Sequence, residues 1–168
     1  MTALSHANEH VRLREVIDID LPIFYAHQRD PVAWKMAAFR SRPRQTFMLH
    51  WKTIRADPTV VLRTILCEDR VAGTVMSFLL KTKRQVGYWI GREYWGQGIA
   101  TAALEQFLHQ VKARPLYAHV AQHNTASLRV LEKCGFTVVG EEPNPPLDGQ
   151  DPIMDYVLKL GRKPSRKN

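Results

Sequence analysis

The stretch "YWGQGIATAAL" at residues 94–104 decides the fold of this chain. It places Gly96 and Gly98 directly before residues whose apolar side chains recur with helical spacing. Glycine adopts the backbone conformations that a tight turn requires, and the first N–H groups of a helix have no partner within the helix. Together with the helix dipole, these N–H groups form a site suited to a phosphate. The stretch therefore predicts a glycine turn that enters a helix and binds an anion.

Two known phosphate-binding motifs do not match this turn. The chain contains no G-x-x-x-x-G-K-[ST] string. A dinucleotide fingerprint requires a third glycine where Thr101 stands, and it opens a βαβ unit, whereas this turn follows several predicted antiparallel strands. We therefore exclude both nucleotide-binding folds.

The other elements are predicted from hydrophobic periodicity, capping residues and turn residues. Strands are predicted at 11–17, 59–67, 70–80, 84–91, 116–120, 136–141 and 153–160. Helices are predicted at 19–28, across 31–56 with a break at Pro43, at 98–113 and at 124–136. Asp18 and Asn124 are expected to cap the first and last of these helices. This order predicts a mixed α/β (α+β) domain, with a mostly antiparallel sheet of about seven strands and about four helices.

The composition indicates one globular domain. The chain has 168 residues, of which 45% are hydrophobic and 24% charged, and we expect a single domain over 1–160 with a basic, disordered tail at 161–168. No apolar run approaches a membrane span and no signal peptide is evident, so a cytoplasmic protein is expected. Cys67 and Cys134 have no metal-ligand spacing and are expected to be reduced thiols, and no metal is expected.

The formal net charge of +8 is unevenly distributed. Residues 29–55 contain seven Lys or Arg residues and only one acidic residue, Asp30. Such a surface is a solvated basic face, or it faces nucleic acid, an acidic partner or a polyanionic cofactor. Because no regularly spaced aromatic residues or nucleic-acid motif accompany the charges, a nucleic-acid partner is disfavoured.

The glycine turn resembles a motif of a known family. The string W-G-Q-G-I-A at 95–100 resembles the acetyl-CoA pyrophosphate loop of the GNAT acyltransferases, [R/Q]-x-x-G-x-[G/A], with Gly98 and Ala100 in the small positions. Trp95 replaces the usual Arg or Gln, as in the branch of ribosomal-protein N-terminal (RimJ/RimL-like) acetyltransferases. The strings "VGYWIGREYWGQGIAT" and "NTASLRVLEKCGF" resemble the fourth strand with its helix and the helix after the fifth strand. The resemblance covers about residues 11–160.

The resemblance implies a single acyl-CoA N-acyltransferase-type domain that uses acetyl-CoA as co-substrate. It implies direct attack of a primary amine on the thioester in a ternary complex, with a protein N-terminus or a small-molecule amine as acceptor. Main-chain groups of Tyr88, Trp89 and Ile90 are implied to bind pantetheine. The other implied cofactor-binding residues are Arg92, Gly96, Gln97, Gly98, Ile99, Ala100, Thr101, Asn124 and Ser127.

The catalytic groups are less well defined by the sequence. Many family members carry a Tyr where this chain has Leu131, and the related branch uses a Ser at the position of Ser127, which is therefore the expected general acid. Glu142, or its neighbour Glu141, is the expected base, with Asp151, Asp155, His119 and His123 as alternatives. The sequence leaves two alternatives: a non-catalytic acyl-CoA-binding protein in place of an enzyme, and a homodimer in place of a monomer.

Overall fold

The computed structural model describes residues 9–145, 149 and 151–162. The expected disordered tail at 161–168 lies outside the described residues from 163 onward. The elements in chain order are β1 (Val11–Arg14), η1 (Asp18–Asp20), α2 (Leu21–Arg29), α3 (Pro31–Ala37), α4 (Arg44–Ala56), β2 (Val61–Cys67), β3 (Arg70–Leu80), β4 (Lys83–Ile90), η2 (Arg92–Tyr94), α5 (Ile99–Gln110), β5 (Leu116–Ala121), α6 (Thr125–Lys133), β6 (Thr137–Asn144) and β7 (Ile153–Leu160).

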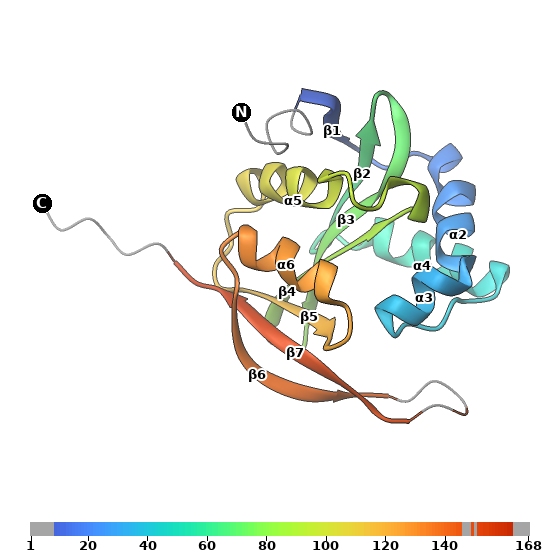
Figure 1. Cartoon of the computed structure of the whole chain (residues 1–168). Coiled ribbons are helices and arrows are strands. Elements are labelled where there is room, and N and C mark those ends of the chain that lie inside the picture. The colour runs from blue at the N-terminus through green and yellow to red at the C-terminus, as the bar shows by residue number, and fades with distance from the viewer. Residues whose placement is uncertain (1–8, 146–148, 150, 163–168) are drawn as a thin grey trace, which may run out of the picture.

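One seven-stranded sheet organises the domain (Figure 1). Its order is β1-β2-β3-β4-β5-β7-β6, and every neighbouring pair is antiparallel except β4 and β5. The predicted mixed α/β fold with a mostly antiparallel sheet is therefore confirmed. The described residues contain five α-helices rather than about four, because the stretch 31–56 divides into α3 and α4. Ala38 ends α3 in a left-handed conformation, and Pro43 precedes α4.

The two faces of the sheet carry different helices. Helices α5 and α6 cover one face, where the largest core cluster includes Leu104, Phe107 and Leu131 from the helices and Val86 and Ala118 from the strands. The opposite face is covered by α2 and α4, which contribute Leu21, Phe24, Phe47 and Trp51 to a second cluster that Val16 and Leu62 complete. The domain therefore has three layers, with the sheet in the middle.

The first helix does not begin as predicted. Residues Asp18–Asp20 form a 3₁₀ turn, and Asp18 makes no cap bond but pairs with Arg55 at 2.6 Å. Asp20, which is fully buried, instead accepts hydrogen bonds from Arg14, the Ile17 N–H and the Thr64 hydroxyl. The prediction of an Asp18 cap was wrong because Asp20 joins this turn to β1 and β2, a long-range contact that capping preference does not include.

Candidate functional site

The strands β4 and β5 separate almost as soon as they meet. They are paired at one position, Gln85 with Tyr117, although β4 continues for five residues beyond it. Over its whole length β4 remains paired with β3 on its other side. The carboxyl-terminal half of β4 therefore has one edge without a strand beside it, in the middle of the sheet.

The alternation of the backbone determines which residues face this open edge. The Gly91 N–H donates to the Ala72 carbonyl at 2.9 Å, so the backbone of Gly91, like that of Trp89 two residues earlier, faces β3. The backbone groups of Tyr88 and Ile90 consequently face the open edge. The Ile90 carbonyl accepts a hydrogen bond from the Trp95 indole at 2.9 Å, which ties Trp95 to the strand although its side chain is 37% exposed.

The glycine turn leads into α5 beside this edge. Gly98 is the N-cap of α5 with φ +76°, and neither a side-chain cap nor an acidic residue in the first turn neutralises the helix terminus. The first backbone bond of the helix runs from the Ala102 N–H to the Gly98 carbonyl. The N–H groups of Ile99, Ala100 and Thr101 have no acceptor within the helix. The side chains of Ile99 and Thr101 are buried, so these residues present their backbone rather than their side chains.

The polar side chains of the loop are held by the protein itself. Arg92, expected to meet a phosphate, pairs through Nε with Asp30 at 2.8 Å, and its side chain is half exposed. Gln97 donates from its side chain to the Glu93 carbonyl at 3.0 Å. To contact a phosphate, the Arg92 guanidinium must either break its ion pair with Asp30 or bind both groups at once.

The N-terminus of α6 brings together Asn124, Ser127 and a residue that the sequence did not single out as a side chain. Asn124 caps the helix by accepting the Ser127 N–H at 3.2 Å, as predicted. The Ser127 hydroxyl lies 2.6 Å from the hydroxyl of Tyr88, which reaches it from β4. Burial raises the pKa of Tyr88 well above its ordinary value, although the hydrogen bond with Ser127 acts in the opposite direction. Leu131, where many relatives carry Tyr, is buried in the core.

Two of the candidate bases, His119 of β5 and Glu142 of β6, lie in contact. His119 Nε2 lies 3.1 Å from Glu142 Oε2, and His119 Nδ1 lies 3.1 Å from Oε1 of Gln85. The imidazole is thus held between a carboxylate and the residue at which β4 and β5 separate. Sheet order explains the meeting, because only β7 lies between β5 and β6.

The other candidate bases are used differently or stand apart. Asp155 accepts hydrogen bonds at both carboxylate oxygens from the side-chain amide of Asn144, at 3.0 and 3.1 Å. His123 Nε2 lies 3.1 Å from the Lys35 carbonyl and joins the β5–α6 loop to α3. Glu141 and Asp151 are exposed. Of the candidates, Glu142 and His119 are the two that the structure brings together.

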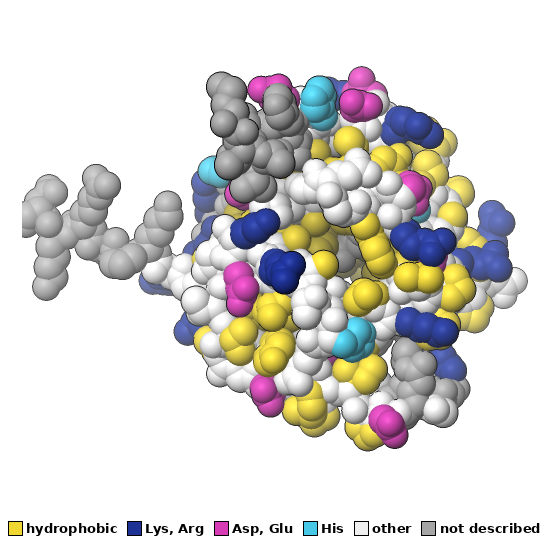
Figure 2. Space-filling model, viewed as in Figure 1, with side chains coloured by type: hydrophobic (Ala, Val, Ile, Leu, Met, Phe, Trp, Pro, Cys, Tyr) yellow, Lys and Arg dark blue, Asp and Glu magenta, His cyan; other side chains and the backbone are white. Residues whose placement is uncertain are grey.

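The surface view agrees with this arrangement. In Figure 1 the N-terminal ends of α5 and α6 point to the same side, toward α2 and α3. Figure 2 shows hydrophobic side chains gathered around a hollow in the middle of this face, with Lys and Arg side chains over the side where α2 and α3 lie. Part of the basic stretch 29–55 has structural contacts, because Arg29 lies over the ring of Tyr25 and Arg42 over that of Phe39.

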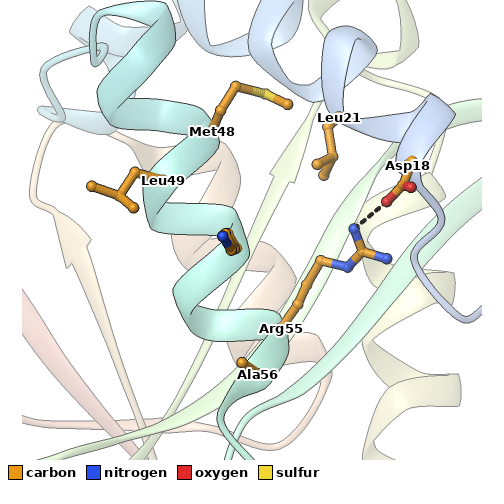
Figure 3. A pocket seen from close by; sticks show the side chains of 7 residues that line it. Asp18, Leu21, Met48, Leu49, Arg55 and Ala56 are labelled. Carbon is orange, nitrogen blue, oxygen red and sulfur yellow. Dashed lines mark hydrogen bonds and ion pairs between the residues drawn. The ribbon is translucent and has the colours of Figure 1, made fainter.

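A second depression lies elsewhere (Figure 3). It is lined by residues of η1, α2 and α4, namely Asp18, Leu21, Met48, Leu49, Lys52, Arg55 and Ala56. None of these comes from β4, α5 or α6, so this pocket is separate from the open strand edge.

Comparison with known proteins places this geometry in a family. The model of the acetyltransferase (GNAT) domain matches residues 10–137. YjcK of Bacillus subtilis, named as a probable N-acetyltransferase, is 35% identical over 77 residues, which are 41% of this chain and 42% of that protein. YdaF of Bacillus subtilis, provisionally named a ribosomal N-acetyltransferase, is 26% identical over 149 residues, or 80% of this chain and 81% of that protein.

A solved structure has the same fold. The spermidine N-acetyltransferase of Vibrio cholerae, solved in complex with CoA and spermine, matches with a TM-score of 0.79 at 14% identity, over 91% of this chain and 96% of that one. At this identity the match shows the shared fold alone. Among the residues that the structure describes, no helix is long and apolar enough to span a bilayer.

Proposed function

Because this chain belongs to the GNAT acetyltransferase family, we propose that it is an N-acetyltransferase that moves the acetyl group of acetyl-CoA to a primary amine. The single observation that carries the proposal is the open edge of β4 beside an uncapped helix N-terminus. An extended pantetheine arm with two amides pairs with a free strand edge, and a diphosphate fits a helix N-terminus that lacks an acidic residue.

The residues of the site divide between these two parts of the cofactor. We assign the diphosphate to the glycine turn at 96–98 and to the N–H groups of Ile99, Ala100 and Thr101. Tyr88 and Ile90 supply the main-chain groups that face the open edge, and we assign to the N–H of Ile90 the polarisation of the thioester carbonyl. Trp89, whose backbone faces β3, supports the strand instead. Asn124 has its side-chain oxygen occupied by the Ser127 N–H, which leaves its amide NH₂ to donate to pantetheine.

The reaction is a direct transfer in a ternary complex. The neutral amine nitrogen attacks the thioester carbon, the carbon–sulfur bond breaks, and its electron pair leaves on the sulfur. The attacking nitrogen must lose a proton, and we assign its removal to Glu142 with His119, directly or through water. Ser127 meets the departing sulfur as a hydrogen-bond donor.

We propose a protein N-terminus as the preferred acceptor, as in the ribosomal-protein N-terminal acetyltransferase branch. An α-amine with a pKa of about 7.7–8.0 is partly neutral at pH 7, whereas a lysine-like amine near 10.4 is almost wholly charged. The Lys and Arg side chains over α2 and α3 repel a polycation such as spermine. The match to YdaF over most of both chains supports this acceptor class.

The test combines binding and turnover. Calorimetry with acetyl-CoA measures binding, and CoA release is measured with a panel of peptides with free N-termini, spermine and small amines. We expect saturable binding, and release of CoA fastest with the peptides. Faster release with spermine than with every peptide contradicts the proposed acceptor, and the absence of binding to folded protein contradicts the site.

A substitution in the glycine turn tests the diphosphate assignment. Gly98→Trp fills the space before α5 and is expected to abolish acetyl-CoA binding. Gly98→Ala carries the same strain of a side chain at positive φ with far less bulk, and Gly161→Trp places the same bulk where an added Cβ meets no atom within 4 Å. Both controls are expected to bind. Unchanged affinity of folded Gly98→Trp removes the assignment.

A non-catalytic acyl-CoA-binding protein is the alternative. Its signature is saturable binding without CoA release for any amine of the panel. The contact of His119 with Glu142 favours the enzyme, because a carboxylate that orients an imidazole is the arrangement of a general base.

A further inference from the structure

Two hydroxyl groups, one from β4 and one from α6, lie within hydrogen-bond distance of each other. The oxygen of Tyr88 lies 2.6 Å from Oγ of Ser127 and 3.2 Å from the Ser127 carbonyl oxygen. These residues are 39 positions apart in the chain, and the pair lies where the open edge of β4 faces the N-terminus of α6. Tyr88 is only partly buried, and its ring packs against the main core cluster.

Each of the two hydroxyl groups can donate or accept, so their protons have two possible arrangements. If the Tyr88 hydroxyl donates to Ser127 Oγ, the serine keeps its own proton for a third group. If Ser127 donates to Tyr88 instead, the phenol donates to the Ser127 carbonyl and the serine has no proton to offer. A negatively charged sulfur between the open edge of β4 and the N-terminus of α6 favours the first arrangement, because only then does the Ser127 hydroxyl direct its proton at the charge.

We propose that Tyr88 is a positioning residue that holds the Ser127 hydroxyl with its proton directed at the departing thiolate of CoA. This inference rests on the proposed acetyltransferase function. The phenol keeps its proton throughout the step. As the carbon–sulfur bond breaks and its electron pair moves to sulfur, Ser127 donates a hydrogen bond to the thiolate, and solvent later supplies the proton that makes the thiol.

The acidities of the groups decide between positioning and proton transfer. A thiol has an ordinary pKa near 8.5 and a phenol near 10, and burial raises the pKa of Tyr88 further. Transfer of the Tyr88 proton through Ser127 to the thiolate would therefore be uphill. A neutral phenol that orients the serine has no such cost.

A double-mutant cycle on the full chain tests the inference. Tyr88→Phe is expected to lower kcat about 3- to 10-fold, the effect of one lost hydrogen bond, with KM for acetyl-CoA within about twofold, as expected for a contact made in the transition state alone. Ser127→Ala is expected to lower kcat at least as much. Because Tyr88 acts through Ser127, adding Tyr88→Phe to Ser127→Ala should cause no further loss, whereas it should still reduce the activity of Ser127→Thr, which keeps a hydroxyl.

Tyr156→Phe is the matched control. Tyr156 also packs against the main core cluster but comes from β7, and this variant should keep wild-type kcat. Wild-type activity in Tyr88→Phe, or losses that multiply in the double variant, overturns the inference while leaving the acetyltransferase proposal intact. A wild-type protein that binds acetyl-CoA without turnover, or does not bind it, overturns both.

Discussion

Removal of the buried carboxylate of Asp20 is expected to destabilise the domain strongly. Its side chain is fully buried and accepts two hydrogen bonds from Arg14, at 2.6 and 2.8 Å, one from the Ile17 N–H at 3.0 Å and one from the Thr64 hydroxyl at 2.6 Å. Asp20→Ala leaves these donors without an acceptor. Loss of one partner of a buried ion pair costs about 3–5 kcal/mol, which lowers Tm by about 6–20 °C in a domain of this size.

Urea denaturation followed by circular dichroism and Trp fluorescence measures this loss as a change in the free energy of unfolding. Asp18→Ala is the matched control, because it removes an aspartate two residues away whose side chain is 88% exposed in its pair with Arg55. Exposed pairs contribute about 0–1 kcal/mol. If Asp20→Ala lowers the free energy of unfolding no more than Asp18→Ala does, the interpretation of Asp20 as the buried link between η1, β1 and β2 is wrong.

The same carboxylate predicts a pH dependence. Burial acts to raise the pKa of Asp20, but the hydrogen bonds from Arg14, Ile17 and Thr64 outweigh it, so the pKa lies below its ordinary value. A carboxylate with a lowered pKa stabilises the fold above its unfolded-state pKa, near 3.9, and the stability is lost as pH falls through the folded-state pKa. Below about pH 4 the free energy of unfolding should therefore fall less steeply in Asp20→Ala than in the wild type.

Two further predictions concern the surroundings of the site. Gly91→Ala would place a Cβ 2.6 Å from Nε2 of the buried His27, so we expect the free energy of unfolding, measured by urea or thermal denaturation, to fall by about 1–3 kcal/mol. Gly87→Ala is the control, because its Cβ would meet only Phe78, at 3.9 Å, and its stability should change little. Equal stability of the two variants would contradict the close packing of Gly91 against His27. Burial raises the pKa of Cys134 to about 12, so its thiol stays protonated at pH 8. Alkylation by iodoacetamide at this pH, followed by mass spectrometry, should therefore be slow in the folded protein and fast in urea. Rapid labelling of Cys134 in the folded protein would refute the raised pKa.

Local sequence patterns predicted most of the elements. The run at 70–80 was predicted as one strand and β3 spans Arg70–Leu80, because its apolar content and the polar turn before it are local signals. The glycine turn was likewise readable, since Gly98 is the residue with positive φ at the start of α5. The separate helices α3 and α4 were indicated by Pro43, but the left-handed end at Ala38 has no strong signal in the sequence.

Contacts between distant segments were not predictable in the same way. Tyr88 and Ser127 meet because β4 passes the N-terminus of α6, a consequence of sheet order and strand register. Register also decides that Tyr88 and Ile90, and not Trp89, face the open edge. The sequence predicted Glu142 as the base and His119 as an alternative, but not that the two lie in contact, because this contact depends on the position of β7 between their strands.

The single rung between Gln85 and Tyr117 has a mechanical consequence for the whole domain. It divides the sheet into a four-stranded half and a three-stranded half, each continuously hydrogen-bonded and therefore stiff. Across the division the backbone provides little resistance to bending, so the helices and side-chain packing must hold the halves in alignment. A ligand arm that hydrogen-bonds to the open edge of β4 lies along this division and stiffens it. Ligand binding at this edge is therefore coupled to the rigidity of the sheet.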